Sequence, residues 1–189
     1  MMSRRLLNLP NVLTLARIGA IPLVVVCYNL PTAWGRPAAA ALFLVSSLTD
    51  WLDGYLARRL GQTSPFGQFL DPVADKLIVA AALVLLVQGH PHSYMAVPAI
   101  VIVGREITVS ALREWMAEIG ERAQVAVSSI GKTKTTLQMI AISLLLYEHK
   151  LYGLPVYELG VACFYVAAAL TLWSMVMYLK AAWPSLRKG

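Results

Sequence analysis

The chain contains four aspartates, and all of them lie within 26 consecutive residues, at Asp50, Asp53, Asp71 and Asp75. The surrounding sequence is strongly apolar, and carboxylates in a membrane-like setting are costly and usually functional. On an insertion scale, each carboxylate costs about 2.5–3.5 kcal/mol at the centre of a bilayer. The four together therefore need positive charge beside them, and a divalent metal is the simplest source of that charge.

The spacing of these aspartates arranges them in two pairs. Residues three or four positions apart share one face of a helix, so Asp50 pairs with Asp53 and Asp71 pairs with Asp75. The segment 61–65 is rich in helix breakers, so two helices can turn back there and bring the pairs together. Four hard oxygen donors suit Mg²⁺ or Mn²⁺. Two such ions, about 3.5–4 Å apart, could hold the attacking and leaving oxygens of a displacement at phosphorus.

A structural interpretation of the same aspartates is that they cap helices or pair with neighbouring basic residues, Arg58, Arg59 and Lys76. Asp71 could be an N-cap followed by Pro72 at the first helical position. A helix that begins at residues 64–65 would instead contain Pro72 and would be expected to kink there. The sequence leaves both starting points open.

The composition is that of a membrane protein. The 189 residues are 58% hydrophobic and only 14% charged, with a mean hydropathy of +0.64, whereas soluble domains carry about 25% charged residues. One domain spanning residues 1–189 is expected, all-α and polytopic, with about six transmembrane helices. The predicted segments are Val12–Leu30, Pro37–Leu60, Asp71–Gln88, Ala96–Met116, Thr133–Tyr147 and Tyr157–Leu179.

Basic residues are distributed unequally between the two ends of these segments. With six spans both termini share one side, which would carry Arg4, Arg5, Arg58, Arg59, Arg113, Arg122, Lys132, Lys134, Lys180, Arg187 and Lys188. The other side keeps Arg36 and Lys150. The positive-inside rule then places both termini and the aspartates at the cytoplasmic face. The net charge of +6 indicates anionic lipid headgroups rather than nucleic acid, because the basic residues are scattered between apolar runs.

The aspartates and their neighbours resemble the signature of the CDP-alcohol phosphotransferase family. That signature is D-x2-D-G-x2-A-R-x8-G-x3-D-x3-D, and Asp50, Asp53, Gly54, Ala57, Arg58, Gly67, Asp71 and Asp75 match its defined positions. The flanking segments resemble the bacterial members that use glycerol 3-phosphate, at residues 8–14 with Arg17, 71–76, 105–107 and 132–135. The resemblance covers most of the first two-thirds of the chain.

The resemblance implies a reaction and a set of roles. A phosphatidyl group would pass from CDP-diacylglycerol to sn-glycerol 3-phosphate, giving phosphatidylglycerol phosphate and CMP. Two ions of Mg²⁺ or Mn²⁺ would be held by Asp50, Asp53, Asp71 and Asp75, and Asp75 would also be the general base. The residues implied to contact the CDP-lipid are Gly54, Ala57, Arg58, Ser64, Gly67, Asn11 and Thr14. A homodimer in the bacterial inner membrane is implied as well.

The acceptor carries its own phosphate, so basic residues should lie beside the metals. Arg105 interrupts an apolar run, and its planar fork suits phosphate, although it could simply pair with Glu106 or snorkel to the membrane interface. Lys132 and Lys134 are further candidates, or plain membrane anchors. A solvent-exposed face with ordinary pairing along a helix is the interpretation of Arg113, Glu114, Glu118, Glu121 and Arg122. No site is assigned to the aromatic residues.

The same residues are compatible with three functions other than transfer to glycerol 3-phosphate. The same chemistry could use another acceptor, such as phosphatidylglycerol or an inositol phosphate, because the signature serves only the CDP-lipid. A small cation transporter would distribute acidic residues through the depth of several spans, whereas these cluster on two. A purely structural subunit gives no reason for four acidic residues in an apolar chain.

Overall fold

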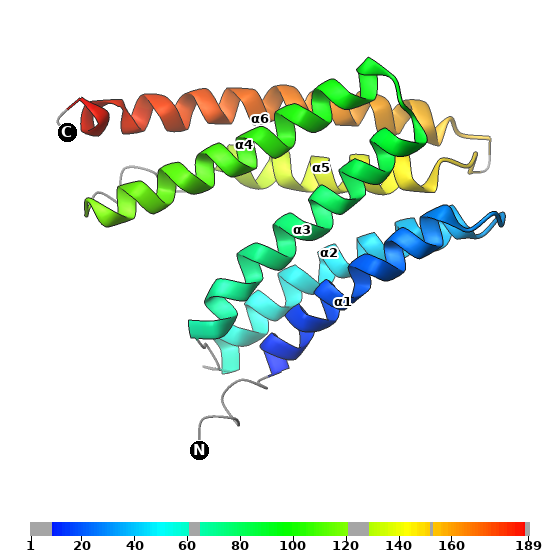
Figure 1. The fold of residues 1–189 in the computed structure, drawn as a ribbon, viewed down its shortest axis with the longest axis horizontal. Helices are drawn as coiled ribbons and strands as arrows, with labels where there is room; N and C mark the ends of the chain where they lie inside the picture. Colours follow the sequence, from blue (N-terminus) through cyan, green and yellow to red (C-terminus); the bar gives the residue numbers. More distant parts are fainter. Residues whose placement is uncertain (1–8, 61–64, 121–128, 152, 188–189) are drawn as a thin grey trace.

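The computed structural model describes residues 9–60, 65–120, 129–151 and 153–187. Within these ranges the side chains of 51–60 and 129–133, with those of Leu9, Pro10, Gln68, Ser93, Ser185 and Leu186, are not described. The described chain forms six α-helices (Figure 1): α1 Leu9–Asn29, α2 Gly35–Leu60, α3 Pro65–Gly89, α4 Ser93–Glu118, α5 Ser129–Tyr147 and α6 Val156–Leu186. Each predicted apolar segment lies within or closely overlaps one helix, so the all-α prediction is confirmed.

Helix α3 settles where the third segment begins. It starts at Pro65, so Pro72 lies inside the helix and not at its first position. Proline lacks the N–H that would bond the carbonyl four residues earlier, yet the helix runs on to Gly89. Asp71 is therefore a residue of the helix body, and Asp71 and Asp75 are one turn apart on the same face.

Three of the described helices are long and apolar enough to cross a membrane. Their spans are Asn11–Asn29 in α1, Tyr94–Glu118 in α4 and Val156–Pro184 in α6, and a shorter apolar stretch covers Lys134–Tyr147 in α5. Since a bilayer core is about 30 Å thick, α6 with its 31 residues is long enough at about 46 Å. The molecule is thus an all-α membrane protein, and spanning by α2, α3 and α5 stays a prediction.

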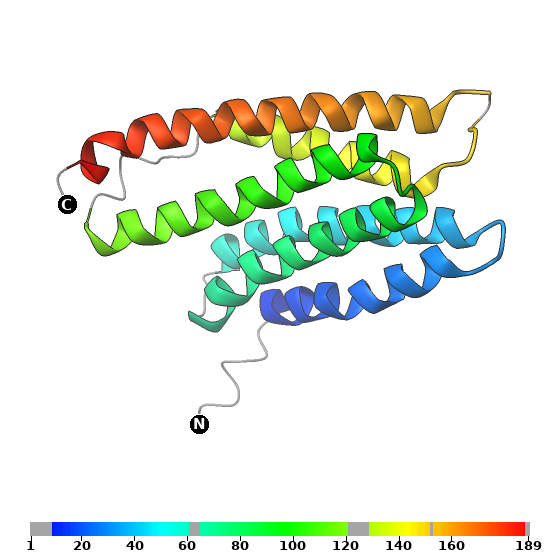
Figure 2. The ribbon, with the colours of Figure 1, turned by 45° about the horizontal axis from the view of Figure 1, so that its top comes forward.

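The helices pack as two groups of three. Helix α1 contacts both α2 and α3, while α6 contacts α4 and α5, and α2 joins the groups through α5. Figures 1 and 2 show α3 and α4 diverging from the turn that connects them. The main apolar core lies between the groups and includes Phe43, Leu86, Ile142 and Phe164, all 0% exposed.

The short turns at the end of the bundle farther from the chain termini are held together by charge. Arg36 at the start of α2 pairs with Glu148 after α5, and the Nε2 atom of His90 after α3 lies 3.3 Å from the same carboxylate. The His90 ring also stacks on Tyr157 of α6, with ring centroids 4.9 Å apart. This network fixes one end of the bundle, whereas α3 and α4 separate toward the other end (Figure 1).

Candidate active site

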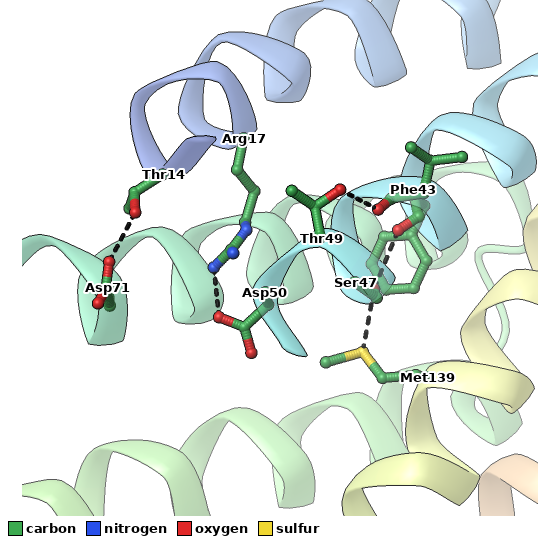
Figure 3. A network of polar contacts seen from close by, with 9 residues as sticks. Thr14, Arg17, Phe43, Ser47, Thr49, Asp50, Asp71 and Met139 are labelled. Atoms are coloured by element: carbon green, nitrogen blue, oxygen red, sulfur yellow. Dashed lines mark hydrogen bonds and ion pairs between the residues drawn. The ribbon is translucent and has the colours of Figure 1, made fainter. Parts of the chain in front are cut away.

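Helix α1 contacts two of the four aspartates directly (Figure 3). The Nη1 atom of Arg17 lies 2.5 Å from Oδ1 of Asp50 on α2. One turn earlier on α1, the Thr14 hydroxyl donates a hydrogen bond of 2.6 Å to Oδ1 of Asp71 on α3. Residues three apart share a helix face, so one face of α1 reaches the carboxylates of two other helices.

The α1 residues of this contact are buried, and the carboxylates are more open. Thr14 and Arg17 are 0% and 2% exposed, whereas the side chain of Asp50 is 39% exposed. A buried guanidinium needs a counter-charge, and Asp50 supplies it. Helix α1 therefore orients the carboxylates of Asp50 and Asp71, and the Asp50 carboxylate stays accessible to a ligand. Asn11, one turn before Thr14, is also buried, at 2%.

The side chains of Asp53, Gly54, Ala57, Arg58 and Lys132 lie outside the described part of the structure, as does Ser64 altogether. Their predicted roles therefore stay predictions. Gly67 is described, and it is buried near the start of α3. Its lack of a side chain lets other groups approach the helix closely.

Asp75 borders a cavity of about 360 Å³ formed by α3, α4, α5 and α6. Its polar lining residues, besides Asp75, are Lys76, Arg105, Glu106, Arg113, Lys134, Thr135, Gln138 and Tyr178. The structure therefore brings the predicted general base and two predicted phosphate-binding residues, Arg105 and Lys134, to one cavity. Four cationic side chains line it, so the cavity suits an anionic ligand.

Two buried cationic side chains in the cavity share one carboxylate. Nη1 of Arg105 lies 2.6 Å from Oε1 of Glu106, and Nζ of Lys134 lies 3.5 Å from the same oxygen. Arg105 is 7% exposed and Lys134 is 2% exposed. Among the described residues, Nε of Arg105 and Nζ of Lys134 have no hydrogen-bond partner.

Unbonded buried donors are costly, and these would be satisfied by the oxygens of an anion. The pairing of Arg105 with Glu106 that the sequence left open is present in the structure. It does not remove Arg105 from the cavity, because the same guanidinium lines it.

Two cavity residues escaped the sequence analysis. Arg113 is exposed, as the sequence analysis expected. It also lines the cavity together with Tyr178, because its Nη2 atom donates a 2.7 Å hydrogen bond to the Tyr178 hydroxyl. Arg113 lies eight residues after Arg105 on α4, a spacing close to two helical turns, which could have suggested a shared face. Nothing in the sequence pointed to Tyr178.

The carboxylates suit divalent metal ions by their chemistry. Asp50, Asp71 and Asp75 offer the hard oxygen donors that Mg²⁺ and Mn²⁺ prefer, and the guanidinium against Asp50 shows that the carboxylates attract positive charge. Among the described side chains, no three of His, Cys, Asp or Glu lie close enough together to form a metal site. The predicted ligand Asp53 lies outside that set.

Comparison with known proteins identifies the family. The model of the CDP-alcohol phosphatidyltransferase family matches residues 7–173, and the chain belongs to this family. Similar proteins include those named "CDP-diacylglycerol--glycerol-3-phosphate 3-phosphatidyltransferase" from Escherichia coli (strain K12), Salmonella choleraesuis (strain SC-B67) and Shigella flexneri serotype 5b (strain 8401). Each is 51% identical to this chain over 175 residues, which cover 93% of the chain and 94% of the relative.

Proposed function

We propose that this protein transfers the phosphatidyl group of CDP-diacylglycerol to sn-glycerol 3-phosphate, with phosphatidylglycerol phosphate and CMP as products. The name shared by relatives that are 51% identical over 93% of the chain supports this reaction. The structural observation that carries it is the cavity, which Asp75, Arg105 and Lys134 line together. A carboxylate beside a cationic pocket is what an acceptor with one reacting hydroxyl and one phosphate requires.

The acceptor's two functional groups fit different sides of this cavity. Its phosphate would be bound by Arg105 and Lys134, because both residues line the cavity and each keeps a buried donor without a hydrogen-bond partner among the described residues. Lys132 would be a further contact. Its hydroxyl would lie at Asp75 on α3. Binding of the phosphate at a fixed place holds the hydroxyl near the base and converts a bimolecular encounter into an oriented one.

In the reaction the acceptor's hydroxyl oxygen bonds to the phosphorus that carries the diacylglycerol, and the bond from that phosphorus to the CMP oxygen breaks. Asp75 takes the hydroxyl proton as the new P–O bond forms. We assign the CDP-lipid to Asn11, Thr14, Gly54, Ala57, Arg58, Ser64 and Gly67. The buried Thr14 and Arg17 orient Asp71 and Asp50 from α1.

Asp50, Asp53, Asp71 and Asp75 would hold two ions of Mg²⁺ or Mn²⁺. When bound, such ions neutralise the charge of a diphosphate and stabilise a leaving phosphate oxygen. The oxygen-only donor set supports this assignment, and it agrees with the exposure of the Asp50 carboxylate.

We further propose that the whole chain acts as one domain in the bacterial inner membrane, with both termini and the active site at the cytoplasmic face. The unequal distribution of basic residues supports this orientation, and the soluble acceptor would then reach the site from the cytoplasm. A homodimer is proposed from the family alone.

The test is an assay of CMP release by the purified protein in mixed micelles with CDP-diacylglycerol. Each acceptor is supplied in turn: glycerol 3-phosphate, phosphatidylglycerol, an inositol phosphate and unphosphorylated glycerol. We expect CMP release with glycerol 3-phosphate. Preferential release with any other acceptor would contradict the proposal, and Asp75→Asn serves as the background control.

A further inference from the structure

Tyr178 of α6 lies against both arginines that α4 contributes to the cavity. Its ring centroid is 5.6 Å from Cζ of Arg105 and 5.0 Å from Cζ of Arg113. Its hydroxyl accepts a 2.7 Å hydrogen bond from Nη2 of Arg113. One aromatic side chain thus contacts two cations by its face and one of them by its oxygen.

The Tyr178 side chain is itself held firmly. It is 7% exposed and belongs to a small apolar cluster between α4 and α6, with Val109, Met116 and Ala182. Packing on several sides restricts an aromatic ring to one rotamer. Tyr178 on α6 therefore offers a fixed aromatic surface to Arg105 and Arg113 on α4.

Such a surface matters because arginine side chains are long and have many rotamers. Ordering one costs conformational entropy that ligand binding must otherwise supply. A guanidinium that is already held by an aromatic face and a hydrogen bond loses less freedom when it binds phosphate. Cations above an aromatic face are also attracted to its electron density, which opposes their mutual repulsion.

We propose that Tyr178 is a positioning residue of the acceptor site, which holds Arg105 and Arg113 in place for the acceptor phosphate. The inference rests on the proposed function. It predicts that Tyr178 governs the apparent affinity for the phosphorylated acceptor and has little influence on the CDP-lipid or on the chemical step.

Two tyrosine variants of α6 test this inference. Tyr178→Phe removes the hydroxyl that accepts from Arg113 and keeps the ring. Tyr165→Phe is the matched control, since its hydroxyl also reaches from α6 to α4, donating to the Tyr94 carbonyl at 2.8 Å, with no part in the cavity. A third variant, Tyr178→Leu, removes the aromatic face as well.

We expect Tyr178→Phe to raise the KM for glycerol 3-phosphate roughly three- to tenfold, with kcat and the KM for CDP-diacylglycerol nearly unchanged. Tyr178→Leu should raise that KM further, and Tyr165→Phe should leave it unchanged. A Tyr178→Phe protein with a normal KM for glycerol 3-phosphate would overturn the inference. So would equal losses for both substrates together with a lower Tm, which would indicate a merely structural role.

Stabilisation by inorganic phosphate gives a second measurement that does not depend on turnover. A ligand that binds the folded state raises the Tm, and the stabilisation grows with the logarithm of one plus the ligand concentration divided by its Kd. Wild-type protein should be stabilised by millimolar phosphate, and Tyr178→Phe should need a higher phosphate concentration for the same shift. An identical response in both proteins would contradict the inference. Absence of CMP release by the wild type with glycerol 3-phosphate would instead refute the proposed function.

Discussion

Replacing Arg105 with alanine tests the acceptor site most directly. Arg105 is 7% exposed, its guanidinium lies 2.6 Å from Glu106, and the residue lines the same cavity as Asp75. A hydrogen bond to a charged group contributes about 1.5–3 kcal/mol. At about 1.4 kcal/mol for each factor of ten, Arg105→Ala should raise the KM for glycerol 3-phosphate roughly 10- to 150-fold.

The rise in KM in Arg105→Ala could also come from the Glu106 carboxylate, which would lose its arginine partner. Without Arg105, the nearest described cation to the Glu106 carboxylate is Lys134 at 3.5 Å, and the carboxylate would repel an incoming phosphate. The double variant Arg105→Ala/Glu106→Gln removes that repulsion. If Arg105 binds the phosphate, the double variant should keep most of the KM increase, because the lost hydrogen bonds are not replaced.

The assay measures initial rates of CMP release while each substrate is varied separately, with both variants and Arg187→Ala as a control. Arg187 is a cation of the α6 end that lies over Trp183, 5.2 Å from its ring centroid, and it does not line the cavity. Its removal should leave both KM values unchanged. A wild-type KM in the double variant would show that Arg105 only neutralises Glu106. A change confined to the KM for CDP-diacylglycerol would mean that the phosphate site has been misplaced.

Three further outcomes are expected. Asp75→Asn should leave a folded, membrane-inserted protein whose rate of CMP release falls by about 10²–10⁴-fold, the usual contribution of a general base. Activity near that of the wild type would exclude Asp75 as the general base. Removal of divalent cations with a chelator should abolish CMP release, and Mg²⁺ or Mn²⁺ should restore it, whereas chelator-resistant activity would contradict the metal assignment. Glu148→Gln should lower the Tm, because Arg36 loses its counter-charge, while both KM values stay unchanged. A large KM change would show that this network communicates with the active site.

The sequence predicted the helices well and their ends less well. Apolar runs of about 20 residues identify membrane helices because the bilayer sets their length. The ends are less certain, because isolated polar residues and prolines interrupt an apolar run without ending the helix: α6 continues past Leu179 to Leu186, through Lys180 and Pro184, and α4 begins at Ser93. Pro72 gave two admissible starts for α3, and only the structure showed the helix beginning at Pro65.

The candidate site could be predicted from the sequence only where it depends on spacing along one helix. The pairing of Asp71 with Asp75, and the interruption of an apolar run by Arg105, are local features of that kind. The contact of Thr14 with Asp71 joins residues 57 positions apart, and Tyr178 meets Arg113 across 65 positions. Such contacts follow from how α1, α4 and α6 pack, which no local pattern encodes.

The packing also explains how one membrane protein can hold opposite charges close together. The four aspartates belong to α2 and α3, in the group that α1 joins, whereas Arg105, Arg113 and Lys134 belong to α4 and α5 in the other group. Among the described residues, Asp75 is the one of these aspartates that lines the cationic cavity. The two charged regions therefore meet at α3, where an acceptor bound by its phosphate would present its hydroxyl to a carboxylate. The diphosphate of a CDP-lipid could occupy the acidic region of α2 and α3 only together with cations. The acceptor phosphate would bind the cationic side chains of α4 and α5, so the two reactants would approach each other from the two helix groups.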